Sequence, residues 1–326
     1  MKKLWFLAFL ALAFHLVQAQ DRHDSSSHSV QFVTVEKDVK LEVLDWGGVG
    51  RPLVFLSGLG NDAHIYDSFA PKFTAQHHVY GITHRGFGAS SKPAPIVTNY
   101  TADRLGDDVL AVINALKLER PVLVGHSIAG EELSSIGSRH PEKVAGLIYL
   151  DAADAYGYYD RFHRDWMLDM IDLRQRIDAL QSGATLDQKF GQDMLTSVTQ
   201  LEKDLQGLTK RMALLPPNTP APPPPPPIGL AIRFGEQKYT QIHAPVLAIF
   251  ACPHNFSIDP NLRNHPAAQA AMVADDRVRC TAQANAFEAG VPSAQVVRIP
   301  DADHYIFHSN EADVIPAMNS FLATLH

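Results

Sequence analysis

Ser127 stands where an apolar run at residues 121–125 is expected to give way to a helix over residues 127–140. A serine on such a sharp turn presents its hydroxyl above the sheet, where it can attack a carbonyl carbon. The turn is crowded, so the residues two before and two after the serine must be small. Here they are Gly125 and Ala129. The pattern predicts that Ser127 is a nucleophile, and a structural serine on a tight turn is the alternative.

A nucleophilic serine needs a base within hydrogen-bonding distance, because its hydroxyl is almost un-ionised at neutral pH. His304 is the candidate, since it lies between a predicted strand at residues 295–299 and a predicted closing helix at residues 311–325. Histidine suits this task because the ordinary pKa of an imidazole lies near working pH. Three other histidines are expected to be neighbours of the site or surface residues: His84, His126 and His308.

The elements that must position these residues alternate between short strands and longer helices. Apolar runs of strand length occur at residues 31–36, 39–44, 52–56, 79–82, 121–125, 144–150, 245–250 and 295–299. Helical segments are expected at residues 63–73, 101–116, 127–140, 266–289 and 311–325. This alternation predicts an α/β fold with a doubly wound, mostly parallel sheet.

The alternation is interrupted after Asp151. Residues 152 to about 210 are helical in character, and six prolines follow at residues 222–227. Prolines cannot continue a helix, so this run is expected to form a polyproline II segment, either as a rigid connector or as a binding motif. We interpret residues 152–228 as a helical lid inserted between two parts of an α/β core, residues 31–151 and 229–326.

Three side chains of the lid are candidates for the wall of a substrate pocket. Trp166, Met167 and Met170 recur at helical spacing and would present an apolar face. The alternative is that they only pack the lid helices against one another.

The N-terminal residues have the pattern of an export signal. Lys2 and Lys3 precede an apolar run that is short for a membrane span, and small residues at Val17 and Ala19 predict cleavage after residue 19. Residues 20–30 are polar and are expected to be a disordered lead-in. We therefore expect a secreted or periplasmic protein with no membrane span after cleavage, and an uncleaved anchor is the alternative.

The composition narrows the class of partner. The chain has 28 basic and 35 acidic side chains, a formal net charge of −7, which argues against nucleic acid and anionic membranes. An apolar fraction of 46% fits a globular protein and not a disordered one. The partner that we expect is a small-molecule substrate. Cys252 and Cys280 either form a disulfide or are two buried thiols, and their spacing offers no metal site. The oligomeric state is left open.

Four segments together resemble the α/β-hydrolase family, in its serine-nucleophile branch. They are residues 56–60, 85–90, 122–130 and 303–305, in the family's order along the chain. The resemblance covers almost the whole mature chain. It implies an eight-stranded sheet, a nucleophile–acid–histidine triad, and no metal or organic cofactor. It also implies an oxyanion hole formed by the backbone N–H groups of Leu59 and Ile128.

The triad acid has two candidates. In most of the family it lies a few residues after the seventh strand, where this chain has no carboxylate before Asp259. Some members place it after the sixth strand, where this chain has Asp151. Asp151 is the preferred assignment and Asp259 the alternative. The structural alternative for Asp151 is that it caps the helix with which the lid segment begins.

The resulting function is the cleavage of a carboxylic ester of a small or medium-sized substrate through an acyl-enzyme. The serine at the turn argues against the dehalogenase and epoxide-hydrolase branches, whose nucleophile is an aspartate. Hydrolysis of amides or N-terminal prolyl peptides, and of carbon–carbon bonds, are alternatives on the same triad. A non-catalytic protein that keeps the fold and binds a ligand is the alternative from another class.

Overall fold

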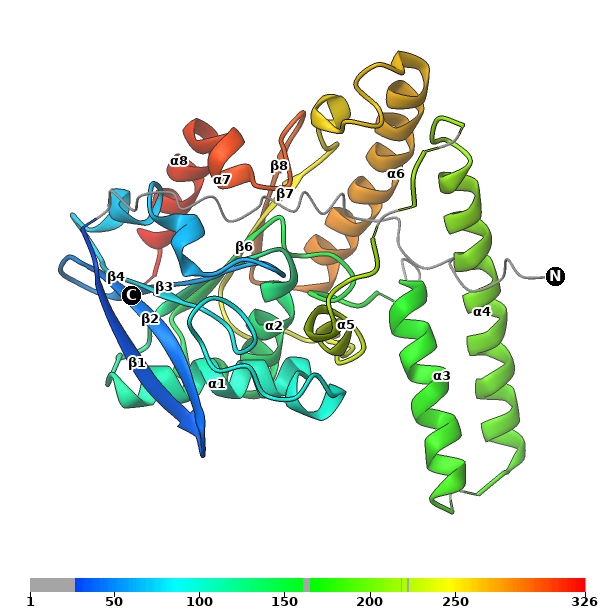
Figure 1. Cartoon of the computed structure of the whole chain (residues 1–326), viewed down its shortest axis with the longest axis horizontal. Coiled ribbons are helices and arrows are strands. Elements are labelled where there is room, and N and C mark those ends of the chain that lie inside the picture. Colours follow the sequence, from blue (N-terminus) through cyan, green and yellow to red (C-terminus); the bar gives the residue numbers. More distant parts are fainter. Residues whose placement is uncertain (1–26, 161–164, 184, 218, 222, 326) are drawn as a thin grey trace.

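The sheet has eight strands in the order β1-β2-β4-β3-β5-β6-β7-β8 (Figure 1). A computed structural model describes residues 27–160, 165–183, 185–217, 219–221 and 223–325. The strands are β1 Ser29–Glu36, β2 Val39–Gly47, β3 Pro52–Leu56, β4 His78–Ile82, β5 Val122–His126, β6 Gly146–Leu150, β7 Val246–Ala251 and β8 Ala294–Ile299. Strands from β4 to β8 pair in parallel, and β2 is antiparallel to β1 and β4. The predicted α/β fold with a mostly parallel sheet is confirmed.

Helices cover both faces of this sheet. They are α1 Ala102–Ala115, α2 Gly130–Arg139, α3 Trp166–Gln181, α4 Gln188–Met212, α5 Pro227–Arg233, α6 Pro266–Gly290, α7 Ile306–Ser309 and α8 Glu311–Leu322. Consecutive residues of one strand face opposite sides of the sheet. Val54 packs in the hydrophobic cluster that includes α1, α2 and α6, and Phe55 packs in the cluster that includes α8. Burial on both faces explains why the central strands are continuous apolar runs.

The segment between β3 and β4 differs from its prediction as one helix over residues 63–73. It forms two short 3₁₀ turns, η1 Ala63–Tyr66 and η2 Ala70–Phe73. Pro71 lies in the first turn of η2, and a proline there cannot donate the backbone bond that a continuous α-helix needs.

The N-terminal boundary also differs by two residues from the predicted lead-in. Ser29 and Val30 are paired with Asp45 and Leu44 of β2, so the ordered strand begins inside the predicted residues 20–30. The predicted leader, residues 1–19, lies outside the described residues. Over the part of the chain that the structure describes, no helix combines the length and apolarity of a membrane span.

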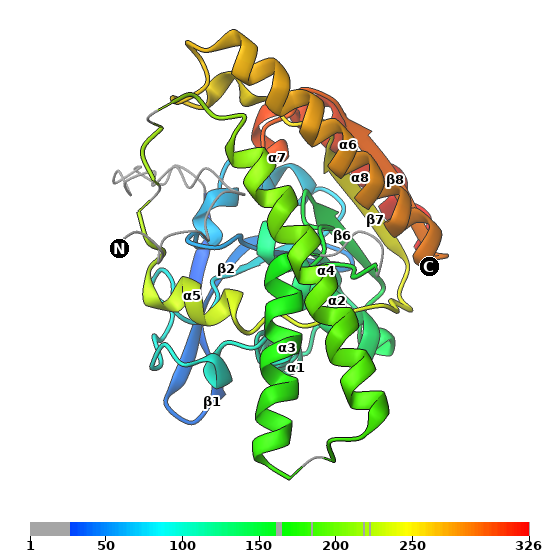
Figure 2. The ribbon, with the colours of Figure 1, turned by 90° about the vertical axis from the view of Figure 1, so that its right-hand side faces the viewer.

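The insertion between β6 and β7 carries three helices. Helices α3 and α4 lie side by side as an antiparallel pair that projects from one side of the molecule (Figures 1 and 2). Arg211 of α4 forms an ion pair with Asp275 of α6, which ties this pair to the core. Pro226 has φ −54° and ψ 150°, the polyproline II region, and Pro227 begins α5. Of the six prolines, Pro222 lies outside the described residues.

Cys252 and Cys280 form a disulfide. It joins the loop after β7 to α6 across 28 residues of sequence. Closing a loop of this length restricts the unfolded chain and contributes about 3 kcal/mol in the chain-entropy account. Of the two alternatives for this pair, the structure contains the disulfide.

Candidate active site

Ser127 occupies the turn from β5 into α2 with φ 54°. A non-glycine residue rarely adopts this left-handed conformation, and here it lifts the hydroxyl out of the sheet. A side chain at Gly125 would meet Leu133 at 2.9 Å and Ala129 at 3.2 Å. A side chain at Gly130 would collide with the carbonyl of Ala152. Small residues are therefore required on both sides of the serine.

His304 lies in the loop between β8 and α7. Its Nε2 is 2.8 Å from Oγ of Ser127, so the imidazole can accept the hydroxyl proton. His126 fixes the backbone of this loop, because its Nε2 donates to the carbonyl of His304 at 3.0 Å. Burial, and then the neighbouring His304, lower the pKa of His126 to about 3, so His126 is a neutral donor.

Asp151 follows β6 with φ 47° and is buried. Its Oδ2 accepts a hydrogen bond from Nδ1 of His304 at 2.6 Å, and its Oδ1 accepts from the backbone N–H of Ala251 at 2.9 Å. Burial alone would raise the pKa of this carboxyl, but His254 and His304 outweigh burial and hold the pKa well below its usual range. Asp151 is therefore an ionised partner for His304.

The alternative acid is engaged elsewhere. Asp259 ends a 3₁₀ turn over Phe256–Ile258, and its Oδ1 accepts a hydrogen bond from the backbone N–H of Asn261 at 2.8 Å. An aspartate that bonds two residues ahead stabilises its own turn. The carboxylate that meets His304 is that of Asp151, so the alternative assignment of Asp259 is not supported by the geometry.

His254 is a neighbour of the triad that sequence reasoning missed. Its Nε2 is 2.8 Å from Oδ2 of Asp151, and its Nδ1 is 2.9 Å from Oδ2 of Asp276 on α6. The only sequence signal was its place three residues after β7, where the family usually has its acid. Its partner Asp276 is 22 residues away in the chain, so no local pattern joins the two.

The loop after β3 lies against the turn that carries Ser127. A Cβ atom on Gly58 would stand 3.0 Å from Cβ of Ser127, so the backbone here approaches the serine closely. Leu59 follows Gly58, and Ile128 begins the first helical turn after the serine, where backbone N–H groups have no acceptor within the helix. The side chain of Leu59 also packs against the apolar cluster that includes Ile128, so the two residues are neighbours in the fold.

An apolar cluster surrounds these two residues. Its buried members are Tyr100, Leu105, Ile128, Tyr156, Ala231 and Ile232, and the side chains packed against them are Leu59, Phe87 and Ile228. The insertion contributes to this cluster through α5. The predicted pocket residues belong to α3 instead, where Met167 is buried and Trp166 and Met170 are half-buried. None of the three is a member of the apolar cluster.

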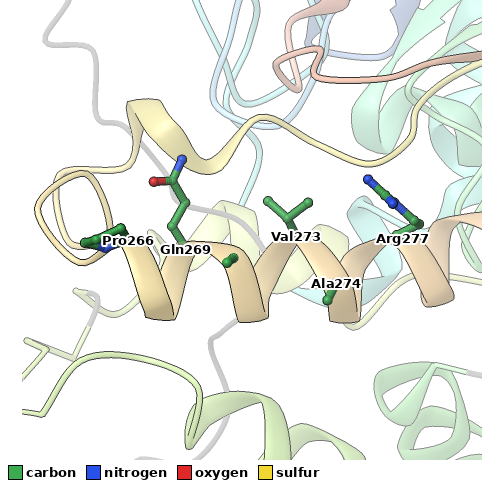
Figure 3. Close-up of a pocket in the computed structure, with 6 residues that line it drawn as sticks. Pro266, Gln269, Val273, Ala274 and Arg277 are labelled. Carbon is green, nitrogen blue, oxygen red and sulfur yellow. The ribbon is translucent and has the colours of Figure 1, made fainter.

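A groove of about 410 Å³ runs along the outer side of α6 (Figure 3). Its lining comes from α6 alone: Pro266, Gln269, Ala270, Val273, Ala274 and Arg277. The groove includes no residue of the Ser127 site, and we assign it no part in the chemistry.

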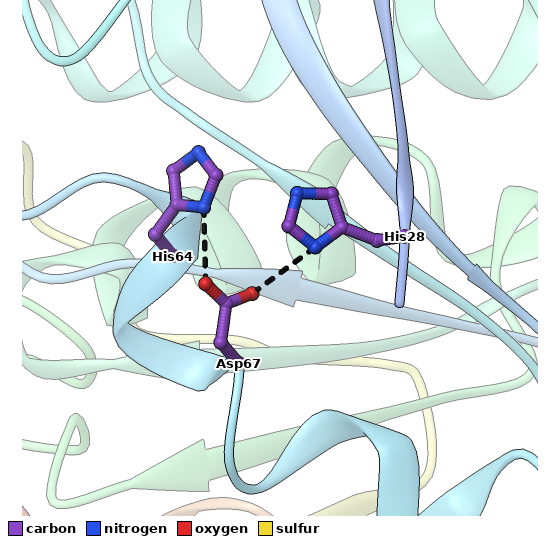
Figure 4. A group of neighbouring side chains, drawn as sticks. All are labelled: His28, His64 and Asp67. Atoms are coloured by element: carbon purple, nitrogen blue, oxygen red, sulfur yellow. Dashed lines mark hydrogen bonds and ion pairs between the residues drawn. The ribbon is translucent and has the colours of Figure 1, made fainter. Parts of the chain in front are cut away.

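Two groups of described residues have the composition of a metal site. One is Asp151, His254 and His304. The other is His28, His64 and Asp67. The imidazoles of His28, just before β1, and of His64, in η1, point at the carboxylate of Asp67 (Figure 4). Hydrogen bonds to Asp67 and then to Glu42 raise the pKa of His64 to about 10. The ring of His64 is therefore protonated, and its protons lie between the ring and these carboxylates. This second group anchors η1 next to the loop of Leu59.

Glu131 lies four residues after Ser127 on α2 and is fully buried. Neither of its carboxyl oxygens has a hydrogen-bond partner among the described residues. Burial, and then the nearby Glu236 and Glu132, raise the pKa of Glu131 well above its ordinary value. The folded protein keeps this proton, whereas the unfolded chain releases it, so the group destabilises the fold increasingly as the pH rises above the ordinary value.

Replacing Glu131 by glutamine is expected to raise Tm at pH 8 by about a few degrees, because the unfolded amide has no proton to release. The gain should shrink toward pH 5, where the unfolded chain also holds most of the proton. Thermal unfolding of the parent and of Glu131→Gln across pH 5–8 measures this difference. Glu142→Gln, at a carboxylate 65% exposed, is the control. A gain of equal size at every pH would contradict the explanation.

Comparison with known proteins supports the family and the fold. The sequence model of the alpha/beta hydrolase fold matches residues 51–311. A fluoroacetate dehalogenase of a Burkholderia species is 32% identical over 120 residues, which are 36% of this chain and 40% of that protein. The 3-oxoadipate enol-lactonase 2 of Acinetobacter baylyi is 30% identical over 122 residues, 37% of this chain and 45% of that protein. The chain thus matches less than half the length of these curated relatives.

A structural neighbour covers nearly the whole chain. A thermophilic esterase from Thermogutta terrifontis superposes with a TM-score of 0.55 over 91% of this chain and 99% of that chain. Its sequence identity is 18%, so this likeness shows the fold alone. Because the family's sequence model spans most of the chain and the sheet has the topology of that fold, this protein belongs to the alpha/beta hydrolase family.

Proposed function

We propose that the protein is a serine hydrolase that cleaves a carboxylic ester through an acyl-enzyme intermediate. The observation that carries the proposal is one chain of hydrogen bonds, from Ser127 to His304 at 2.8 Å and from His304 to Asp151 at 2.6 Å. This is the arrangement of nucleophile, base and orienting acid on which serine hydrolases of unrelated folds converge. The enol-lactonase among the relatives favours ester chemistry within the family.

In the first half-reaction, Oγ of Ser127 attacks the carbonyl carbon of the ester as Nε2 of His304 takes its proton. Charge develops on the carbonyl oxygen, and we expect the N–H groups of Leu59 and Ile128 to donate to it. Each such donor is worth roughly 3 kcal/mol of transition-state stabilisation. His304 then gives the proton to the leaving alkoxide, and the acyl group remains on Ser127.

In the second half-reaction, water takes the place of the alcohol and His304 removes its proton. Attack on the acyl carbon regenerates the Ser127 hydroxyl and releases the carboxylic acid. Asp151 accepts from Nδ1 of His304 throughout, so Nε2 is the nitrogen left free to exchange protons with the substrate. No step transfers electrons or requires a metal.

The walls of the site favour an apolar acyl or alcohol group of small or medium size. The apolar side chains that pack around Leu59 and Ile128, among them Ile232, support this preference. A serine in place of the aspartate nucleophile argues against the dehalogenase chemistry named for the Burkholderia relative. Amides, prolyl peptides and carbon–carbon bonds remain alternative substrates on the same triad.

A panel of chromogenic substrates tests the proposal. We expect p-nitrophenyl acetate and butyrate to give a burst of p-nitrophenol equal to the enzyme concentration, followed by steady turnover, because the acyl-enzyme forms before it is hydrolysed. The matching p-nitroanilides and proline p-nitroanilide should turn over more slowly. Faster cleavage of the anilides would move the assignment to amide hydrolysis, and no turnover of any substrate would reject the ester proposal.

We also propose that the mature protein acts outside the cytoplasm, as a secreted or periplasmic enzyme. The apolar run near the N-terminus and the Cys252–Cys280 disulfide support this location, since disulfides persist in oxidising compartments. Mass spectrometry of the protein exported by its own cells should find a mature N-terminus at Gln20. An intact Met1 on the exported protein would contradict the cleavage.

A further inference from the structure

We propose that His254 is a positioning residue of the triad, an imidazolium that binds the second side of the Asp151 carboxylate and makes the active site work at lower pH. The inference rests on the proposed function, because it concerns the base and acid of that reaction. It adds a residue that the family's nucleophile–acid–histidine triad does not contain.

The hydrogen-bond geometry requires a charged His254. Nε2 of His254 faces Oδ2 of Asp151 at 2.8 Å, and Nδ1 faces Oδ2 of Asp276 at 2.9 Å. A neutral imidazole has a single N–H donor, whereas a carboxylate oxygen can only accept. Both ring nitrogens therefore carry a proton, and the ring is an imidazolium between two carboxylates.

The charges around His254 agree with this assignment. Burial would lower the pKa of His254, but Asp151 and Asp276 outweigh it and raise the pKa well above its ordinary value. Three other titratable groups lie nearby: Asp154, His304 and Arg279. The charges of His254, His304 and Arg279 all lower the pKa of the Asp154 carboxyl, which places the four groups close together.

The support for His254 is rigid. Oδ2 of Asp276 also accepts from the backbone N–H of His254 at 2.8 Å, and Oδ1 of Asp276 accepts from Arg279 at 3.0 Å. Cys252 lies two residues before His254, and Cys280 lies four residues after Asp276, one turn further along α6. The disulfide thus joins the two segments that carry the ring and its counter-ion.

The position after β7 explains why a cation belongs there. The family usually places its triad acid at this point, whereas in this chain Asp151 follows β6. His254 fills the vacated side of the site with a donor that bridges Asp151 to α6. Oδ2 of Asp151 consequently accepts two hydrogen bonds: one from the charged ring of His254 and one from Nδ1 of His304.

This charge has a consequence for the pH dependence of catalysis. The ring centroids of His254 and His304 are 6.3 Å apart. A positive charge at that distance opposes protonation of His304, which must be neutral to act as a base. Removing the charge should move the acidic limb of the kcat/KM profile toward higher pH by about two pH units, for an effective dielectric near 20.

The test compares pH profiles of kcat/KM for p-nitrophenyl butyrate from pH 4 to 9. We expect His254→Asn to shift the acidic limb upward by about two pH units and to lower the plateau about tenfold. His254→Arg, which keeps a positive charge, should restore the limb to the parent's position. His78→Asn is the matched control, since His78 bonds the carboxylate of Asp45 outside the site, and it should leave the profile unchanged.

A lower plateau with an unmoved limb in His254→Asn would assign His254 a structural role and overturn the proposal. Independently of any variant, nitrogen-15 NMR of the parent protein at pH 8 should find both nitrogens of His254 protonated, and a neutral ring would also overturn it. Failure of the proposed function is distinguishable, because the parent protein would then have no turnover to profile while the NMR result would still stand.

Discussion

Replacing Ser127 by alanine is expected to lower kcat/KM for p-nitrophenyl butyrate by at least about 10⁴-fold, because no other group near His304 can take over the covalent step. The residual rate should be that of the oxyanion donors and substrate binding alone. Steady-state kinetics at pH 8 measure the ratio. Alanine adopts the left-handed backbone conformation at this position as readily as serine does. The Tm should therefore change little.

Ser182→Ala is the matched control for this variant. Ser182 ends α3, is exposed, and bonds only within its own helix end. Its substitution should leave kcat/KM within about twofold of the parent, as for surface changes away from the site. If Ser127→Ala retained a tenth or more of the parent activity, Ser127 would not be the nucleophile.

Replacing Asp151 by asparagine is expected to lower kcat by about 10³- to 10⁴-fold with a smaller change in KM. An asparagine can present an N–H to Nδ1 of His304 where the carboxylate accepts, which would place the imidazole proton on Nε2 and face it toward Ser127. The base would then be blocked. The same change also removes the negative charge that faces His254. The acidic limb of the pH profile of kcat/KM should therefore become poorly defined as well.

Asp259→Asn provides the comparison for the acid. Its carboxylate stabilises only the turn to Asn261, so kcat should stay within about twofold of the parent. The ranking of the two variants decides the acid directly. A large loss in Asp259→Asn together with a small loss in Asp151→Asn would reverse the assignment made from the structure.

The sequence predicted the parts of the site that depend on local turn chemistry or on order along the chain. The small residues Gly125 and Ala129 predict the turn that carries Ser127, and the two are tightly packed against each other in the structure. His304 and Asp151 follow from their places after predicted strands, because parallel strands bring their carboxyl ends to one edge of the sheet. Asp259 remained the alternative by order along the chain, and the hydrogen bond of Asp151 to His304 separates the two aspartates.

His254 could not be predicted in the same way. Its role depends on α6 packing beside the loop after β7, which brings Asp276 and the disulfide to it. The packing of a helix against a loop from another part of the chain is a tertiary property. Hydrophobic periodicity along the sequence carries no information about which polar faces will meet.

The insertion shows a similar limit. Helical periodicity predicted helices over most of residues 152–210, and α3 and α4 lie there. The helix of the insertion that packs next to Leu59 and Ile128 is instead α5, after the prolines, together with Tyr156 from the segment before α3. A seven-residue helix that begins at Pro227 has too few turns to reveal an apolar stripe, so Trp166, Met167 and Met170 were the stronger pattern but not the nearer residues.

The central claim is that Ser127 is an activated nucleophile, and labelling with a fluorophosphonate probe tests it most directly. Intact mass spectrometry of the parent protein should show the addition of one probe molecule, and peptide mapping should place it on Ser127. Ser127→Ala should acquire no label under the same conditions. Absence of label on the folded parent protein, or equal labelling of Ser127→Ala, would contradict the account.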